Sequence, residues 1–286
     1  MSMADTVLVM GDGCRPTILA GDREQLPPTV MTHDQTRDGR IVNMLSAQAK
    51  VSILEKLQRS GWPSFILTNQ YRIVSGSFDL ARTIIYPGIK DFQYAESAAL
   101  TNHPMATQIE TWVTSTYQAA PSPPGKILPL FFHCNGAQCL VDEAVGSRYN
   151  DRHNGLVVKL VLGLRGLGVK ASDIVVITPY WANLGRLEMA LKAGHCRVVV
   201  VSTTDAFQGQ EGLVVIFDLV VNRATGPLFV QDPHRICVGA TRHVGALFVV
   251  GDINTVSDLV ARGEVPVRSD TGQTLSVKKT VFRDFL

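Results

Sequence analysis

Short apolar runs rich in β-branched residues alternate along the chain with longer segments in which apolar residues recur every three or four positions. This alternation is typical of a parallel β-sheet with helices on both faces. The runs lack a regular polar alternation, as expected for strands that are buried on both sides. We therefore predict an α/β fold with strands over seven ranges: Pro16–Ala20, Phe65–Thr68, Leu128–His133, Ile174–Thr178, Arg197–Val201, Leu213–Leu219 and Ala246–Val250.

Two of the intervening segments have a clear helical face, which we expect to pack on the sheet. The first face consists of Ile53, Leu54 and Leu57, and the second of Leu156, Val157, Leu160, Val161 and Leu164. The segment Ala95–Lys126 contains four prolines and has weak periodicity, so we predict an irregular excursion there.

Composition places limits on partners and cofactors. The chain has 286 residues, is 45% hydrophobic and carries a net charge of +2, so it can fill a core but lacks the basic excess of a dominant phosphate-binding surface. Any nucleic-acid binding must therefore come from a local groove. The five cysteines form no CxxC pair, which argues against a disulfide framework or a zinc ribbon, and we predict no metal site built from protein ligands.

No stretch has the features of a secretory leader, and no apolar run reaches the roughly 20 residues that span a bilayer. We expect an intracellular protein, cytoplasmic or nuclear, with reduced thiols and no membrane partner.

Five polar segments follow apolar runs, and their order along the chain is informative. The most informative, Val199–Glu211, joins a β-branched run to a loop that contains Gly209 and Glu211. The other four are Gly21–Pro28, Leu67–Arg72, Ile177–Tyr180 and Val238–Arg242.

Together these segments resemble the superfamily 1 helicases, in the branch that contains the nonsense-mediated-decay helicase and Senataxin. The resemblance covers roughly Asp5 to Val256 and matches only the C-terminal part of such a motor. It implies a RecA-like parallel sheet of the P-loop NTPase helicase fold. It also implies three regions: 1–31 as the tail of a first RecA-like domain, 32–59 as a connecting helical segment, and 60–286 as the second RecA-like domain.

The resemblance implies catalytic roles for Gln25, Arg72 and Arg242. Gln25 would sense the γ-phosphate, Arg72 would contact phosphate, and Arg242, on a predicted helix, would be the arginine finger. Gly209 and Glu211 would bind the cofactor, ATP with Mg²⁺, by close main-chain approach and by accepting from a ribose hydroxyl. The alternatives are an ordinary Gly-Asp turn for Gln25, a solvated cation for Arg72 and a helix-end cation for Arg242.

The resemblance also implies a contact surface for single-stranded RNA or DNA. Pro27 would lead to this surface, and Thr178, Pro179, Tyr180 and Thr203 would hold the sugar-phosphate backbone. Trp181 could stack on a base, but we favour a partly buried aromatic residue that opens a helix.

The sequence departs from the family at several points. Val221 stands where the family usually has an arginine, Asn183 replaces a glutamine and Gly212 replaces an acidic residue. No Gly-rich loop ending in Gly-Lys-Ser/Thr is found. Gly163–Lys170 imitates one but is predicted to end a helix, and Asp142-Glu143 imitates a magnesium-binding pair but is predicted to be an ordinary surface pair.

The sequence therefore favours the C-terminal part of an ATP-dependent RNA or DNA helicase, with an ATP site completed by the missing first domain. One alternative is a binding module without ATPase activity that holds single strands or a protein partner. Another is an unstable fragment, since residues 1–31 would leave their own sheet and expose apolar surface.

Overall fold

The computed structural model describes residues 16–30, 32, 35–256, 266–268, 274–276 and 280–286. The chain divides into two compact units, Met1–Leu67 and Thr68–Leu286. The prediction that the second domain begins near residue 60 stays a prediction. The assignment of 1–31 and 32–59 to particular parts of a helicase motor stays a prediction.

The described part of the first unit contains little regular structure. Its elements are β1 (Thr36–Arg37), β2 (Arg40–Ile41), α2 (Ser46–Ala49) and α3 (Ile53–Arg59). The predicted strand Pro16–Ala20 is wrong, since the segment is extended without a ladder and Ile18 is 97% exposed. An apolar run becomes a strand only when neighbouring strands bond to it, and within the described part of this unit the only ladder joins β1 and β2.

Two other predictions fail in this unit. Phe65–Thr68 is not a strand, and Phe65 and Leu67 are 92% and 89% exposed. Ile53, Leu54 and Leu57 do lie on α3, but no residue of that helix is fully buried. This face is therefore not a core-packing face within the described residues.

The second unit is built on a five-stranded sheet in the order β5-β11-β10-β8-β9, with every neighbouring pair parallel. This confirms the predicted fold class. The strands are β5 (Leu130–His133), β8 (Ile174–Thr178), β9 (Val200–Thr203), β10 (Gly212–Asp218) and β11 (His243–Gly251). Each coincides with or overlaps a predicted strand, and the largest offsets are at β9, which starts three residues later than predicted, and at β11, which starts three residues earlier.

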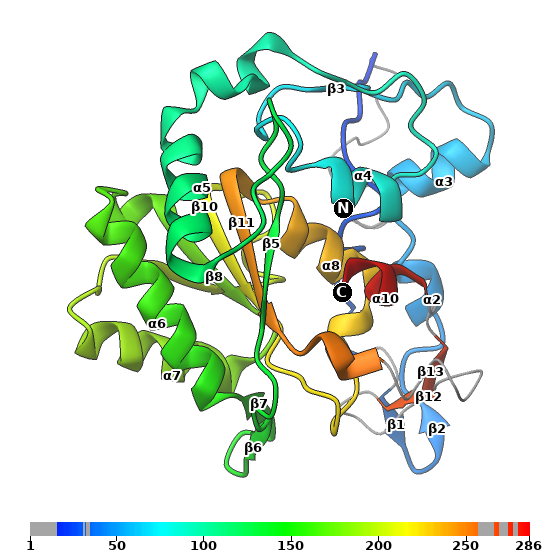
Figure 1. Ribbon diagram of the computed structural model, residues 1–286. Helices are drawn as coiled ribbons and strands as arrows, with labels where there is room; N and C mark the ends of the chain where they lie inside the picture. Colours follow the sequence, from blue (N-terminus) through cyan, green and yellow to red (C-terminus); the bar gives the residue numbers. More distant parts are fainter. Residues whose placement is uncertain (1–15, 31, 33–34, 257–265, 269–273, 277–279) are drawn as a thin grey trace. The chain divides into compact units, whose positions relative to one another are not determined.

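Helices cover both faces of this sheet, as predicted (Figure 1). In β8, Ile174 and Val176 join one apolar cluster, while Val175 and Ile177 join the other. The first cluster contains buried residues of α5 (Pro104–Tyr117), α6 (Asp151–Gly166) and α7 (Trp181–Ala193). The second contains buried residues of α4 (Asp79–Ile84), α8 (Pro233–Ala240) and α10 (Thr280–Phe285).

The predicted face of α6 is confirmed, since Val157, Leu160, Val161 and Leu164 are all buried against the sheet. The helix ends at Gly166, as predicted for the stretch that imitates a phosphate loop. The irregular excursion predicted for Ala95–Lys126 is wrong, because the segment contains the 14-residue helix α5. Pro104 occupies the first turn of α5, where a missing N–H costs nothing, and so it begins the helix instead of breaking it.

Smaller ladders complete the unit. They are β3 (Asn69–Gln70) with β4 (Gln93–Tyr94), β6 (Leu140–Asp142) with β7 (Ser147–Tyr149), and β12 (Pro266–Arg268) with β13 (Thr274–Ser276). Asp142 and Glu143 lie at the turn of the β6–β7 hairpin, as expected for a surface pair. Among the described residues, none of the helices combines the length and the apolar character needed to cross a bilayer.

Candidate functional site

Two arginines predicted to contact phosphate both donate hydrogen bonds to Thr241. Nη2 of Arg72 donates to the carbonyl oxygen of Thr241, and Nη2 of Arg242 donates to the Thr241 hydroxyl at 2.9 Å. Nη1 of Arg72 also donates to Oε2 of Glu211 at 3.2 Å. Arg72, Glu211 and Arg242, far apart in the sequence, therefore meet around Thr241.

The prediction that Arg242 lies on a helix is wrong. Helix α8 ends at Ala240, and Arg242 lies in the short link before β11, with a side chain that is only 5% exposed. The change of place has a physical reason, since Thr241 closes the helix by donating its hydroxyl to the carbonyl oxygen of Cys237 at 2.6 Å.

Arg72 is held in place by its local backbone. The side-chain oxygen of Gln70 accepts from the backbone N–H groups of Arg72 and Ile73, at 3.0 and 3.2 Å. Ile73 and Val74 are fully buried, and the N–H of Val74 donates to the carbonyl oxygen of Val244, next to the start of β11. These two apolar residues thus anchor the arginine segment to the sheet.

A buried, neutral histidine lies near Arg72 and Arg242. His243 is fully buried, and its Nε2 lies 2.7 Å from the hydroxyl of Ser77. Burial and the nearby charges of Arg72 and Arg242 lower the pKa of His243 to about 3. Near neutral pH the imidazole therefore adds no third positive charge to this cluster.

Hydrogen bonds, ion pairs and a buried aromatic side chain hold the loop between β9 and β10 in place. The Thr203 hydroxyl accepts from the N–H of Ala206 at 3.2 Å, and Phe207 is buried in the core. The Asp205 carboxylate pairs with Arg235 of α8 at 3.2 Å, while Glu211 pairs with Arg72. Gly209 has φ of +84°, a backbone conformation that favours glycine, and so the turn that presents Glu211 depends on it.

The ends of β8 and β9 lie side by side at the carboxyl edge of the sheet. Thr178 and Thr203, both predicted to contact a nucleic-acid backbone, are direct partners in the ladder. Thr178, Pro179 and Tyr180 are buried, and Thr203 is 7% exposed. Their predicted contact with nucleic acid stays a prediction.

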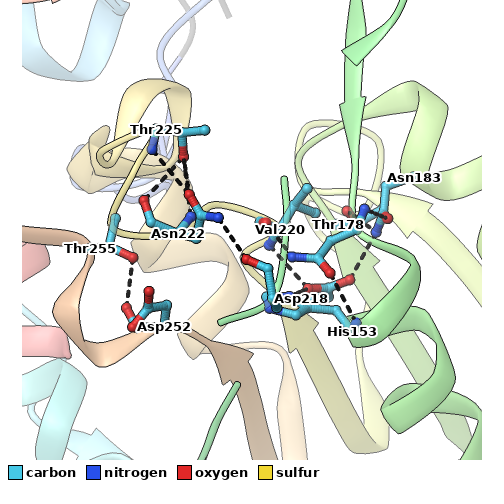
Figure 2. Close-up of polar contacts among 11 residues, drawn as sticks. His153, Thr178, Asn183, Asp218, Val220, Asn222, Thr225, Asp252 and Thr255 are labelled. Carbon is cyan, nitrogen blue, oxygen red and sulfur yellow. Dashed lines mark hydrogen bonds and ion pairs between the residues drawn. The ribbon is translucent and has the colours of Figure 1, made fainter. Parts of the chain in front are cut away.

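A buried polar network fixes this edge (Figure 2). The carboxylate of Asp218, at the end of β10, accepts from Nδ1 of His153 and Nδ2 of Asn183, both at 2.8 Å, and from the N–H of Val220 at 3.0 Å. Nδ2 of Asn183 also donates to the Thr178 hydroxyl at 3.1 Å. These contacts join α6, α7, β8 and β10 at one point.

Two residues that depart from the family pattern are explained by this packing. Val221 is fully buried, so an arginine in its place would have its charge in the core. At Gly212, an added Cβ would lie 2.6 Å from Cγ2 of Val175, which excludes an acidic side chain without a shift of β8.

The remaining predicted residues belong to the first unit. Nε2 of Gln25 donates to Oδ2 of Asp22 at 2.8 Å, which holds the side chain within the turn. Pro27 is exposed two residues further on. The roles of both residues stay predictions.

Sequence reasoning missed Ser77, His153, Asp218 and His243. His243 directly follows the predicted arginine finger, which gave one signal, but its hydrogen-bond partner Ser77 lies 166 residues away in the sequence. Trp181 was expected to be partly buried, and this is wrong, since it opens α7 with a side chain that is 69% exposed.

Comparison with known proteins places Arg72, Glu211 and Arg242 within a recognisable domain. A family model described as an AAA domain matches residues 49–254. The chain is 28% identical over 251 residues to the DNA polymerase alpha-associated DNA helicase A of Saccharomyces cerevisiae, an alignment that covers 84% of this chain and 34% of that protein.

Two further relatives extend the comparison. The chain is 29% identical over 248 residues to the mouse DNA-binding protein SMUBP-2, covering 84% of this chain and 23% of the relative. It is 26% identical over 247 residues to a regulator of nonsense transcripts 1 homolog of Neurospora crassa, covering 84% and 20%. The chain thus spans about a third or less of the length of these relatives.

Proposed function

The chain belongs to the AAA domain family, within its superfamily 1 helicase type, and from this we propose that it is the C-terminal motor domain of an ATP-dependent RNA or DNA helicase. The observation that carries the proposal is the meeting of Arg72, Glu211 and Arg242 around Thr241. Two cations and an exposed carboxylate in one place suit a ligand that has both phosphates and a sugar.

Helicases of this type use ATP with Mg²⁺. When bound, this cofactor would supply the phosphoryl group whose transfer drives the motor. In the proposal, Arg72 and Arg242 stabilise negative charge on the phosphates, and Glu211 accepts from a ribose hydroxyl. Neutral His243 leaves the two guanidinium groups free of a repelling third cation.

Magnesium ligands and a phosphate loop are proposed to come from elsewhere. Within the described residues no three or more His, Cys, Asp and Glu side chains form a metal-binding group, and the sequence has no Gly-rich loop ending in Gly-Lys-Ser/Thr. Gln25 is proposed to join the γ-phosphate side of the completed site.

Single strands of RNA or DNA are the proposed partner. The register pairing of Thr178 with Thr203 supports one continuous contact surface along the ends of β8 and β9. Because the side chains of Thr178 and Thr203 are largely buried, we propose that main-chain groups make much of the phosphate contact. These groups belong to the two threonines and to Pro179, Tyr180 and Gly209. Pro27 is proposed to lead toward the same strand.

A second candidate function is a binding module without ATPase activity. The buried Val221, at a position where the family usually has a cation, favours it. The two proposals differ in catalytic output, because only the first requires nucleotide binding at the Arg72–Arg242 cluster.

The first experiment measures the affinity of the purified chain for a fluorescent ATP analogue and its ATP turnover, with and without single-stranded RNA. We expect measurable nucleotide binding that Arg72→Ala and Arg242→Ala weaken by about tenfold or more, as for loss of a charge-assisted contact. Arg283→Ala, at a surface arginine paired with its neighbour Asp284, is the matched control and should leave the affinity unchanged.

Turnover by this chain alone should be negligible, because the phosphate loop is missing from the sequence. Robust turnover that Arg242→Ala abolishes would refute the proposal that the chain supplies only part of the site. Nucleotide affinity that neither arginine changes would favour the binding module.

A further inference from the structure

Trp181 has an exposed indole in a position where the chain is otherwise well packed. Its side chain is 69% exposed, whereas its neighbour Tyr180 is 3% exposed and Asn183 is fully buried. Large aromatic residues are highly buried on average, so an indole that stands out from a buried segment needs an explanation.

The backbone that carries Trp181 is fixed on both sides. Before it, Thr178 ends β8 inside the sheet and bonds to Asn183 through its hydroxyl. After it, the N–H of Ala182 donates to the hydroxyl of Ser147 at 3.2 Å, and Asn183 donates to the buried Asp218 carboxylate at 2.8 Å. The indole therefore sits on a rigid support, which lowers the entropy lost when a flat ligand stacks on it.

The position of this support matches the ligand edge of the sheet. Trp181 follows the end of β8, and β8 is paired with β9 so that Thr178 and Thr203 are direct partners. In open parallel sheets, ligands bind beyond the carboxyl ends of the strands. The loop with Gly209 leaves β9 at the same edge, so an indole and loops suited to phosphate contact come from adjacent strands.

Trp181 does not belong to a continuous exposed apolar surface along α7. The next strongly exposed apolar side chain of α7 is Met189, eight positions further on and about 12 Å along the helix axis at 1.5 Å per residue. A tryptophan at the centre of a protein interface normally lies within a packed apolar patch. Along α7 the indole stands apart from other strongly exposed apolar side chains, which fits a planar, single-layer ligand better than a packed protein interface.

We propose that Trp181 stacks on a base of the bound single strand and so supplies a base contact next to the backbone contacts of the β8 and β9 loops. The inference rests on the proposed binding of single strands. Stacking uses the flat face that every base has, so it adds affinity without strong sequence preference.

The test compares strands that have bases with strands that lack them. Labelled oligouridylate, oligothymidylate and an abasic oligonucleotide, each of about 12 nucleotides, are bound to the full chain and followed by fluorescence anisotropy. For the wild type we expect tighter binding to the two base-containing strands. Trp181→Ala should weaken those two roughly 5- to 100-fold and leave the abasic strand unchanged.

Two variants serve as controls. Trp181→Phe keeps an aromatic face and should retain most of the preference for bases. Trp62→Ala removes an indole that is 64% exposed in the first unit and should change none of the three affinities.

The outcomes separate the inference from the function on which it rests. If the wild type binds all three strands and Trp181→Ala binds each strand with the same affinity as the wild type, stacking is overturned while single-strand binding stands. Equal loss of affinity for the base-containing and abasic strands would also overturn it, since that result indicates a lost backbone contact. No binding of any strand by the wild type would overturn the proposed function itself.

Discussion

The buried imidazole of His243 predicts how the stability of this chain depends on pH. Burial, Arg72 and Arg242 lower its pKa from 6.5 to about 3, so the folded chain keeps the ring neutral where the unfolded chain takes up a proton. The unfolded state therefore gains protons as the pH falls below 6.5, and folding loses free energy over the range from 6.5 down to about 3. Above this range the full contribution is present.

The magnitude follows from the two pKa values. Relative to high pH, His243 should lower the free energy of unfolding by about 1 kcal/mol at about pH 5.5 and by about 3 kcal/mol at about pH 4.5. Other groups titrate over the same interval, so the useful quantity is the difference between the wild type and a variant without this imidazole. His243→Gln keeps a polar group that can reach the hydroxyl of Ser77 and does not titrate.

The assay is urea unfolding of the wild type and of His243→Gln at several values from about pH 8 to about pH 4.5. We expect the wild type to lose about 3 kcal/mol more than the variant across this interval. His195→Asn is the control, because His195 is exposed and has φ of +59°, which asparagine tolerates. It should follow the wild-type curve. Parallel curves for the wild type and His243→Gln would refute the reasoning, because they would mean that folding does not lower the affinity of His243 for a proton.

Three further changes test the packing around the site, each by urea unfolding against the wild type. Asp218→Ala leaves the buried donors of His153 and Asn183 without their shared acceptor and should cost about 3–5 kcal/mol, whereas a loss below about 1 kcal/mol would show that the network adds little. Asp218→Asn keeps the shape and one acceptor, so it should lose less than Asp218→Ala. Gly212→Asp places a Cβ 2.6 Å from Cγ2 of Val175 and should cost about 1–3 kcal/mol, and an unchanged midpoint would contradict the overlap.

The sheet was predictable because its strands are unusually explicit in the sequence. Ile174–Thr178 is a β-branched run buried on both faces, and such a run has few alternatives to a central parallel strand. Pro16–Ala20 is also an apolar run, but no strand pairs with it among the residues that the structure describes, and pairing is not encoded in the run itself. The prolines of Ala95–Lys126 do not by themselves predict α5, because a proline breaks a helix in its interior but is tolerated in its first turn, where Pro104 lies.

The residues of the site could be predicted in part, whereas their contacts and charge states could not. The resemblance selected Arg72, Glu211 and Arg242, which the fold brings together, but pattern alone could not show that Arg72 bonds to Glu211 across 139 positions. The neutral state of His243 and the shared acceptor at Asp218 arise from burial. Burial depends on how helices from distant parts of the chain cover the sheet, which local sequence does not specify.

Thr241 has a geometric consequence for the two arginines. Its carbonyl accepts from Arg72 and its hydroxyl from Arg242, so the spacing of the two anchor points is limited by the dimensions and torsion angles of one residue. Two cations placed by separate helices would drift whenever those helices moved. Here a displacement of the link between α8 and β11 carries both anchor points together, and a ligand that pulls on one guanidinium group also shifts the support of the other.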